Sequence, residues 1–323
     1  AGRAYGVAVP DVDIVASLSP KMLTRHLQSR SARSRTASRP NAEDLEMRQL
    51  QKNAIRACTE KLVSSSGLKF RRSAFRGAEP KVTLLAPASL GLSDVNVPVD
   101  FSVNSLAPLH NAALLTECGK IDPRAKALAL LVRRWAKDRG VCHAAKGHLS
   151  PHVWTLLVIY FLQVGADGDG ALLPPLECFE FSSGLMVKRG EAPVLARQPW
   201  QRAKSETSLA ELFRDFFRFY ASFNWRGEAV AIRIGERAAP AVSLPLHMII
   251  SEDGAGTEVG PSIEDPFAAG QNLGSCLTAW SFARLKEELS RAQGLCIGGA
   301  SLTTLLEPWA PTEREGAEEG GVP

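Results

Sequence analysis

The stretch that most constrains the fold is residues 120–163, in which two helical patterns are joined by a polar loop. In the first pattern, apolar side chains recur at helical spacing on one face, while Arg133 and Lys137 lie on the other. The second pattern, Trp154–Gln163, is almost entirely apolar but too short to cross a bilayer. We therefore predict a globular domain with a fully buried helix at its centre.

Arg133 and Lys137 are four residues apart, so their side chains are neighbours on the helix surface. The planar arginine head and the compact lysine charge can grip a polyphosphate at two points. A solvated basic helix face is the simpler alternative on this stretch alone. The pair is therefore a candidate phosphate site with a structural alternative.

The start of the buried helix is marked by Ser150, which directly precedes Pro151. This order predicts an N-cap serine followed by proline in the first helical position, with backbone N–H groups directed toward any cleft above. His152 then falls in the first turn. Its ring could stack on a base, although packing against Trp154 is the simpler interpretation.

Composition indicates a globular protein: 45% of the 323 residues are hydrophobic, and the length favours two domains. A net charge of +4 permits a polyanionic partner without requiring one. The six cysteines form no CxxC pair, which favours reduced thiols in a cytosolic, nuclear or organellar compartment. We expect a cytoplasmic protein with no membrane partner. Because the chain opens on Ala1 rather than Met, a longer N-terminus is also expected.

Aspartates on predicted strands form the candidate metal site. The strand pattern of residues 5–16 places Asp11 and Asp13 on one face, since they are two apart. A second strand, within residues 95–103, carries Asp100. Carboxylates held side by side repel unless a cation lies between them, so these three predict a two-metal site that favours Mg²⁺. A surface strand with solvated aspartates is the alternative for the first pair.

The remaining segments carry weaker signals. An arginine- and serine-rich run predicts a flexible loop, and the acidic C-terminal end predicts a disordered tail. Periodicity predicts further helices at residues 42–64, 216–225 and 277–293, and strands at residues 81–85 and 229–235.

Several of these blocks resemble a known family when they are taken in order. They are residues 6–15, 97–115, 122–140, 147–163, 212–225 and 262–274. Their order is similar to that in non-canonical poly(A) polymerases and terminal uridylyltransferases, within the DNA polymerase β-like nucleotidyltransferase superfamily. The resemblance implies an α+β fold: a small mixed-sheet nucleotidyltransferase domain at 1–108, a mainly helical central domain of the poly(A)-polymerase-associated type at 109–310, an active cleft between them, and a tail at 311–323.

The resemblance also implies a function. We expect template-independent transfer of nucleotides from UTP or ATP to an RNA 3′-hydroxyl, with Mg²⁺ or alternatively Mn²⁺ as cofactor and RNA-binding proteins as further partners. The implied catalytic and metal-binding residues are Asp11, Asp13 and Asp100. The implied nucleotide-binding residues are Gly2, Asn111, Arg133, Lys137, Ser150, His152, Asp265, Gln271 and Asn272.

Two departures from the family pattern affect the catalytic strand. Family members carry a Gly-Ser pair where this chain has Ala1 and Gly2, so the serine hydroxyl is absent. A gap-free match puts Val15 at the second catalytic aspartate, whereas a shift of two residues restores Asp11 and Asp13. We prefer the shift, with a catalytically degenerate RNA-binding protein as the alternative.

Two further departures affect nucleotide choice. Gln271 stands where uridylyl-specific relatives carry a histidine, and His152 stands where relatives carry a tyrosine that stacks on the base. Both changes are expected to weaken the discrimination between UTP and ATP. Asn111 matches the residue expected to contact the ribose 2′-hydroxyl. We therefore predict an RNA uridylyltransferase with appreciable ATP use, and a poly(A) polymerase as the alternative.

Overall fold

The computed structural model describes residues 12–19, 43–75, 80–92, 95–105, 107–165, 170–179, 205–251, 253–268 and 270–310. The predictions made for Gly2, Asp11, the arginine- and serine-rich run and the C-terminal tail lie outside these residues. The chain divides into two compact units, one within residues 6–112 and one from residue 113 onward.

The first unit is built on a four-stranded mixed sheet with the order β1-β4-β3-β2. β1 runs parallel to β4, and the other two pairings are antiparallel. The strands are β1 (Val12–Ala16), β2 (Lys69–Ala74), β3 (Lys81–Ala86) and β4 (Val97–Val103). A 3₁₀ turn, η1 (Ala88–Leu90), follows β3.

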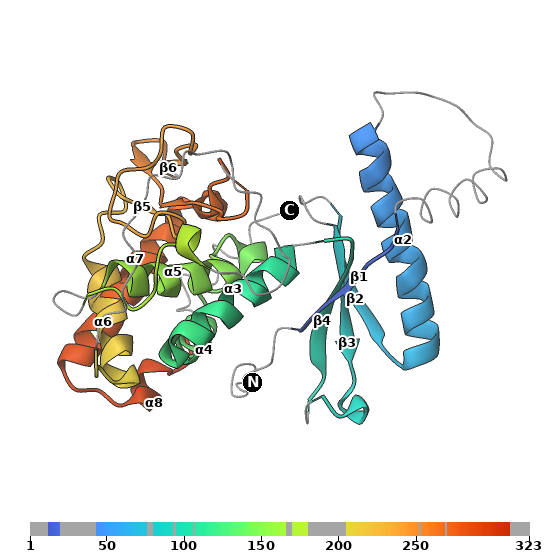
Figure 1. Ribbon diagram of the computed structural model, residues 1–323, viewed down its shortest axis with the longest axis horizontal. Helices are drawn as coiled ribbons and strands as arrows, with labels where there is room; N and C mark the ends of the chain where they lie inside the picture. The colour runs from blue at the N-terminus through green and yellow to red at the C-terminus, as the bar shows by residue number, and fades with distance from the viewer. Residues whose placement is uncertain are drawn as a thin grey trace. The chain divides into compact units, whose positions relative to one another are not determined.

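One face of this sheet is covered by the long helix α2 (Glu43–Ser66), which runs along it in Figure 1. Ile55 of α2 is fully buried in a core with Val99 and Phe101 of β4. Because side chains alternate across a strand, the residues between these apolar positions point to the opposite face. That face carries Asp100 and its register partners on the two neighbouring strands.

The second unit is mainly helical. Its helices are α3 (Ala107–Ile121), which begins in the first unit, α4 (Pro123–Asp138), α5 (Pro151–Val164), α6 (Leu209–Ala221), α7 (Ala279–Ile297) and α8 (Leu302–Leu305). Two short strand pairs accompany them: β5 (Ala229–Val230) with β8 (Ser262–Ile263), and β6 (Met248–Ile250) with β7 (Thr257–Val259). The 3₁₀ turns are η2 (Ala144–Lys146), η3 (Leu176–Cys178) and η4 (Leu273–Cys276).

Helix α5 forms the centre of this unit, as its sequence predicts. Every residue from Val153 to Gln163 is buried. Trp154 meets Trp135 of α4 edge to face, with 5.6 Å between ring centroids, and Trp135 lies 4.7 Å from Phe217 of α6. Helices α4, α5 and α6 therefore pack together through contacts between these aromatic rings.

The described elements agree with the predicted fold class, an α+β chain with a small mixed sheet and a mainly helical second unit. The edge strand β2 was not predicted, because all six of its residues are exposed and no apolar alternation marks it. Among the described helices, none combines the length and apolar character needed to cross a bilayer.

Candidate active site

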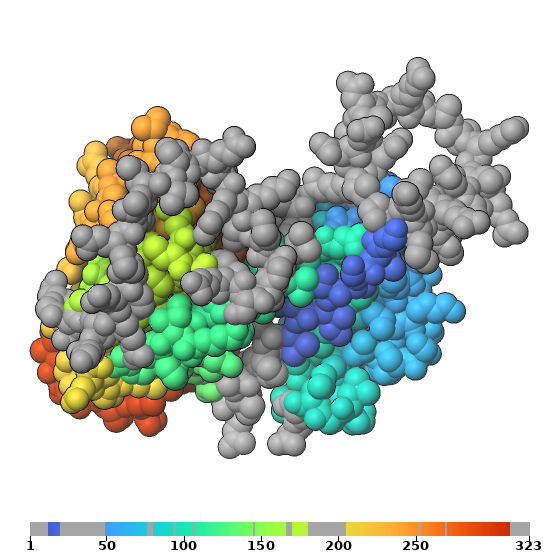
Figure 2. All heavy atoms as spheres, viewed as in Figure 1, coloured from blue at the N-terminus to red at the C-terminus, as the bar shows by residue number. Residues whose placement is uncertain are grey.

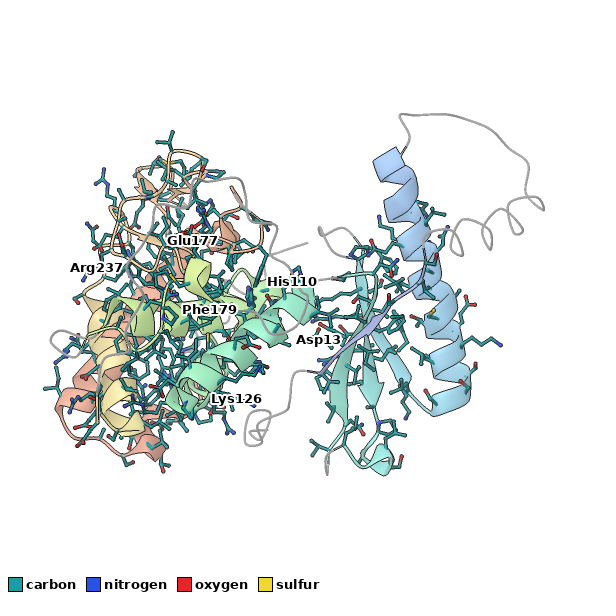
Figure 3. All side chains as sticks on the ribbon, viewed as in Figure 1. Asp13, His110, Lys126, Glu177, Phe179 and Arg237 are labelled. Atoms are coloured by element: carbon teal, nitrogen blue, oxygen red, sulfur yellow. The ribbon has the colours of Figure 1, made fainter. Side chains whose placement is uncertain are left out.

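The two described catalytic candidates of the first unit are directly paired. Asp13 on β1 and Asp100 on β4 are register partners in the parallel ladder, so their side chains leave the sheet on the same face. Asp13 is exposed, and the atoms of β1 are among the dark blue spheres at the surface of this unit in Figure 2. Figure 3 labels Asp13 on that strand. Asp11, the third candidate, lies outside the described residues.

Asp100 is held by two side chains of β3. Lys81 Nζ lies 2.6 Å from its Oδ2, and the Thr83 hydroxyl donates to its Oδ1 over 2.6 Å. Thr83 is the register partner of Asp100, and it also accepts a hydrogen bond of 3.3 Å from Nε of Arg72 on β2. The carboxylate is therefore oriented by a polar row that crosses the sheet.

The donor chemistry of this face suits a divalent cation. Carboxylate oxygens are the hard ligands that Mg²⁺ takes in proteins, and register-paired strand positions bring two carboxylates together. Within the described ranges, no group of three acidic, histidine or cysteine side chains gathers to hold a metal. Asp13 and Asp100 are the described candidate ligands on this face, and Asp11, the third candidate, lies outside the described residues.

Val15 bears on the two possible alignments of the catalytic strand. It pairs with Ser102 and, being two residues after Asp13, shares the face of the aspartates. A hydrocarbon side chain therefore lies on the candidate metal face, and the gap-free alignment would put it at the position of a catalytic aspartate. Within the described part of β1, only Asp13 offers a carboxylate there.

The cationic residues predicted to grip phosphates lie on α4 of the second unit. Arg133 and Lys137 are both half-buried and lie one turn apart. Arg134, the cation between them in sequence, forms an ion pair with the buried Asp138, with Nε 2.6 Å from Oδ2. The helix therefore uses Arg134 for its own structure.

Ser150 is the N-cap of α5, as predicted. Its hydroxyl accepts a hydrogen bond of 3.3 Å from the backbone N–H of Val153. His152 follows in the first turn, and burial lowers its pKa to about 4 because a desolvated imidazolium is disfavoured. The carboxylate of Asp265 acts against this shift, and the charge of Arg133 adds to it. The predicted residues Arg133 and Asp265, from distant segments, are therefore both within electrostatic reach of His152.

The loop from residue 262 to residue 274 is closed by its own polar groups. The Asp265 carboxylate accepts hydrogen bonds from the backbone N–H of Phe267 at 2.9 Å and of Ala268 at 3.3 Å. The backbone N–H of Asp265 donates to the carbonyl of Gln271 at 3.0 Å. The side chain of Gln271 is exposed at the end of this closed turn.

Asn272 is buried, and its side-chain amide bonds to the backbone of its surroundings. Its Oδ1 accepts from the N–H of Ile263 at 3.0 Å and of Gly274 at 2.8 Å, while its Nδ2 donates to the carbonyl of Pro245 at 3.1 Å. A side chain at position 274 would place Cβ 2.1 Å from the carbonyl oxygen of Pro261, so only glycine fits there. Asn272 and Gly274 therefore form the frame of the loop.

The segment just after the loop packs against the residues that precede α5. The Cys276 thiol lies 3.5 Å from the carbonyl oxygen of the buried His148. A Cβ added at Gly147 would lie 3.4 Å from the carbonyl oxygen of Cys276, so the two backbone segments approach closely. The ring of His148 lies 5.4 Å from that of Trp280. These contacts join the segment that follows the loop to the residues that precede α5, the helix that carries His152.

Sequence reasoning missed some contributors to these sites. Lys81 and Thr83 orient Asp100 but belong to a strand whose register could not be assigned from sequence. Glu264, buried beside Asp265 in the chain, is paired with Arg233 at 3.1 Å. The acidic pair at 264 and 265 is visible in the sequence, but no motif identifies the arginine. Asn111 is half-buried on α3.

Comparison with known proteins adds to this geometry. Residues 208–270 match the family described as Cid1 family poly A polymerase. The chain is 29% identical over 209 residues to the human Speckle targeted PIP5K1A-regulated poly(A) polymerase, covering 61% of this chain and 22% of that protein. It is 28% identical over 205 residues to Terminal uridylyltransferase cid1 of Schizosaccharomyces pombe, covering 61% and 50% respectively. The chain thus spans half or less of the length of these relatives.

Solved structures show the same fold. The Cid1 poly(U) polymerase with MgGTP bound superposes with a TM-score of 0.60 at 21% identity, covering 93% of this chain and 81% of that chain. mtPAP in complex with ATPγS gives a TM-score of 0.60 at 17% identity, covering 85% and 57% respectively. The predicted α+β architecture is confirmed by these likenesses.

Proposed function

We propose that this chain, which belongs to the family of non-canonical poly(A) polymerases and terminal uridylyltransferases, adds nucleotides from NTPs to the 3′ end of RNA without a template. The observation that carries this proposal is the direct register pairing of Asp13 with Asp100 on one face of a small mixed sheet. The polar row that orients Asp100 supports it. That this face also holds Val15 is the argument for a degenerate member of the family.

Each candidate group has a role in the proposed reaction. Asp13 and Asp100, with Asp11, would hold Mg²⁺ or Mn²⁺, which when bound neutralises phosphate charge and favours the ionised 3′-hydroxyl. Asp100 accepts the proton of that hydroxyl as its oxygen attacks the α-phosphorus. The bond from the α-phosphorus to the bridging oxygen breaks, and pyrophosphate leaves.

Residues of the second unit, together with Asn111 from the end of the first, would bind the nucleotide. Arg133 and Lys137 contact the β- and γ-phosphates as charge-assisted donors. His152 stacks on the base as a neutral ring, because its lowered pKa keeps it uncharged near pH 7. Asn111 contacts the ribose 2′-hydroxyl and thereby favours ribonucleotides.

Base selection is assigned to Gln271, the exposed residue next to the loop frame. Its amide offers a donor and an acceptor to the edge of uracil, yet it lacks a rigid ring that would exclude a purine. We therefore propose UTP as the preferred substrate with appreciable use of ATP. The relatives include both poly(A) polymerases and a uridylyltransferase, so a poly(A) polymerase is the second candidate.

The test is extension of a labelled short RNA by the full chain with Mg²⁺ and each NTP in turn. Asp100→Asn keeps the side-chain shape but removes the charge, and it should abolish extension. Glu60→Gln changes an exposed carboxylate on α2 of the same unit and serves as the control. A wild type that binds RNA but extends nothing would leave the degenerate alternative, and equal extension by Asp100→Asn would refute the assignment of the site.

A further inference from the structure

The ammonium group of Lys81 forms an ion pair with the carboxylate of Asp100, which we assign to metal binding. The ammonium group lies 2.6 Å from Oδ2, while the Thr83 hydroxyl donates to Oδ1. Both carboxylate oxygens therefore already have a donor. Each oxygen still has a second lone pair, so a divalent cation could bind the same carboxylate, but the ammonium group would then lie against a second cation and repel it.

The two donors differ in their freedom to leave. Thr83 is directly opposite Asp100, is buried, and has a short side chain held by a bond from Arg72. Lys81 is opposite Ser102 and reaches Asp100 diagonally along its flexible stem. Its side chain is 43% exposed, so its head can move into water without burying a charge. Lys81 is the donor that a metal would displace.

The ion pair between Lys81 and Asp100 lies beside a second carboxylate, that of Asp13. Asp13 and Asp100 are register partners on adjacent strands, so two negative charges share one face. An ammonium group on Asp100 reduces the repulsion between them when no metal is bound. Binding of a divalent cation replaces that partial compensation and breaks the ion pair, so the pair lowers the net affinity for metal.

We propose that Lys81 is a displaceable internal cation that competes with the divalent metal for Asp100 and thereby sets the metal concentration at which the site fills. This inference rests on the proposed function, because it takes Asp100 to be a metal ligand. Lys81 leaves Asp100 for solvent as the metal enters, and Thr83 stays in place as the donor that keeps the carboxylate oriented.

The experiment measures Mn²⁺ binding to the full chain, without RNA or NTP, by the electron paramagnetic resonance signal of the free ion. Lys81→Met removes the charge and keeps most of the stem. It should tighten Mn²⁺ binding about threefold to fivefold, the size of a partly exposed ion pair. Lys81→Arg keeps the competing charge and should bind no tighter than the wild type. Lys69→Met, at an exposed position on the edge strand β2 of the same sheet, should leave binding unchanged.

Asp100→Asn tests whether the measured Mn²⁺ binds at Asp100. This variant should lose the Mn²⁺ binding whose affinity changes in Lys81→Met. Unchanged or weaker binding by a Lys81→Met chain with a wild-type circular dichroism spectrum would overturn the inference, as would Mn²⁺ binding by neither chain. An Asp100→Asn chain that binds like the wild type would also overturn it. The Mn²⁺ experiment does not depend on RNA extension, which is tested separately. If Lys81→Met binds Mn²⁺ more tightly but the wild type extends no RNA, the proposed function is refuted and the inference about Lys81 stands.

Discussion

Arg139 and Glu288 form a buried bidentate ion pair, in which Nε and Nη2 of the arginine each lie 2.8 Å from a carboxylate oxygen. The pair joins the end of α4 to α7. Arg284 adds a bond of 3.2 Å to the same carboxylate and lies over the ring of Trp309, with 4.0 Å from its Cζ to the centroid. The glutamate therefore neutralises two buried arginines.

Glu288→Gln should destabilise the second unit strongly, because two buried guanidinium groups would lose their counter-charge. Breaking a buried pair by removing one partner typically costs about 3–5 kcal/mol. Urea unfolding followed by tryptophan fluorescence would measure this, since all six tryptophans lie after residue 113 and report on the second unit. Glu287→Gln, at the exposed neighbouring position, is the control and should shift the midpoint little. Equal midpoints for the two variants would contradict the role given to Glu288.

Asn272 should affect nucleotide binding through the loop that it holds. Asn272→Ala leaves the N–H groups of Ile263 and Gly274 without their acceptor, at a cost of about 1–3 kcal/mol for each buried group left unsatisfied. We expect a raised KM for the NTP together with lower thermal stability. Asn272→Asp keeps the acceptor for the two N–H groups but turns a second acceptor toward the carbonyl of Pro245 and buries a charge, so it should also lower stability. A raised KM for Asn272→Ala with unchanged stability would instead indicate direct contact with the nucleotide.

The lowered pKa of His152 predicts how stability depends on pH. The folded chain resists protonation of this ring down to about pH 4, whereas the unfolded chain takes up the proton near the ordinary value of 6.5. Stability from this group is therefore complete above pH 6.5 and falls as the pH drops from 6.5 toward 4. His152→Phe removes the titration. The difference in urea midpoint between wild type and variant, measured from pH 7.5 to 4.5, should change across that window, and a constant difference would show that the ring titrates normally.

Gln271→His should narrow the choice of nucleotide. In the wild type we expect UTP to be preferred over ATP by roughly tenfold, about 1.4 kcal/mol. A rigid ring at this exposed position should crowd a purine, so the variant should shift further toward UTP in competition assays with equal UTP and ATP. Ala283→His, at an exposed position on α7, controls for an added ring. ATP preferred by the wild type would make the protein a poly(A) polymerase.

Much of the second unit could be predicted because its signals are local. The apolar run of α5 and the order Ser150-Pro151 are readable in the sequence, and the structure confirms both the buried helix and its cap. The edge strand β2 was not predictable, since its residues are all exposed and its partner is set only by the antiparallel ladder with β3. Strand pairing is a long-range relation that the local pattern does not encode.

The candidate site shows the same division. The sequence marks Asp13 and Asp100 as chemically interesting, but their meeting depends on the register between β1 and β4. The interaction of Lys81 with Asp100 depends in addition on a diagonal reach across β3 and β4. The bonds of Asn272 come from backbone groups up to 27 residues away, so a motif could identify the residue without revealing that its amide already has partners.

The fit of Gly274 against Pro261 has a consequence for how this protein could change over time. Substitution at position 274 is closed by the backbone itself, and Asn272 is tied to three backbone partners, whereas Gln271 between the turn and this frame projects outward. Among the described residues of the loop, Asn272 and Gly274 are therefore constrained by the backbone, whereas Gln271 is exposed. On the proposed role of Gln271, a single codon change at this position would alter the base preference of a descendant without removing the bonds that hold Asn272.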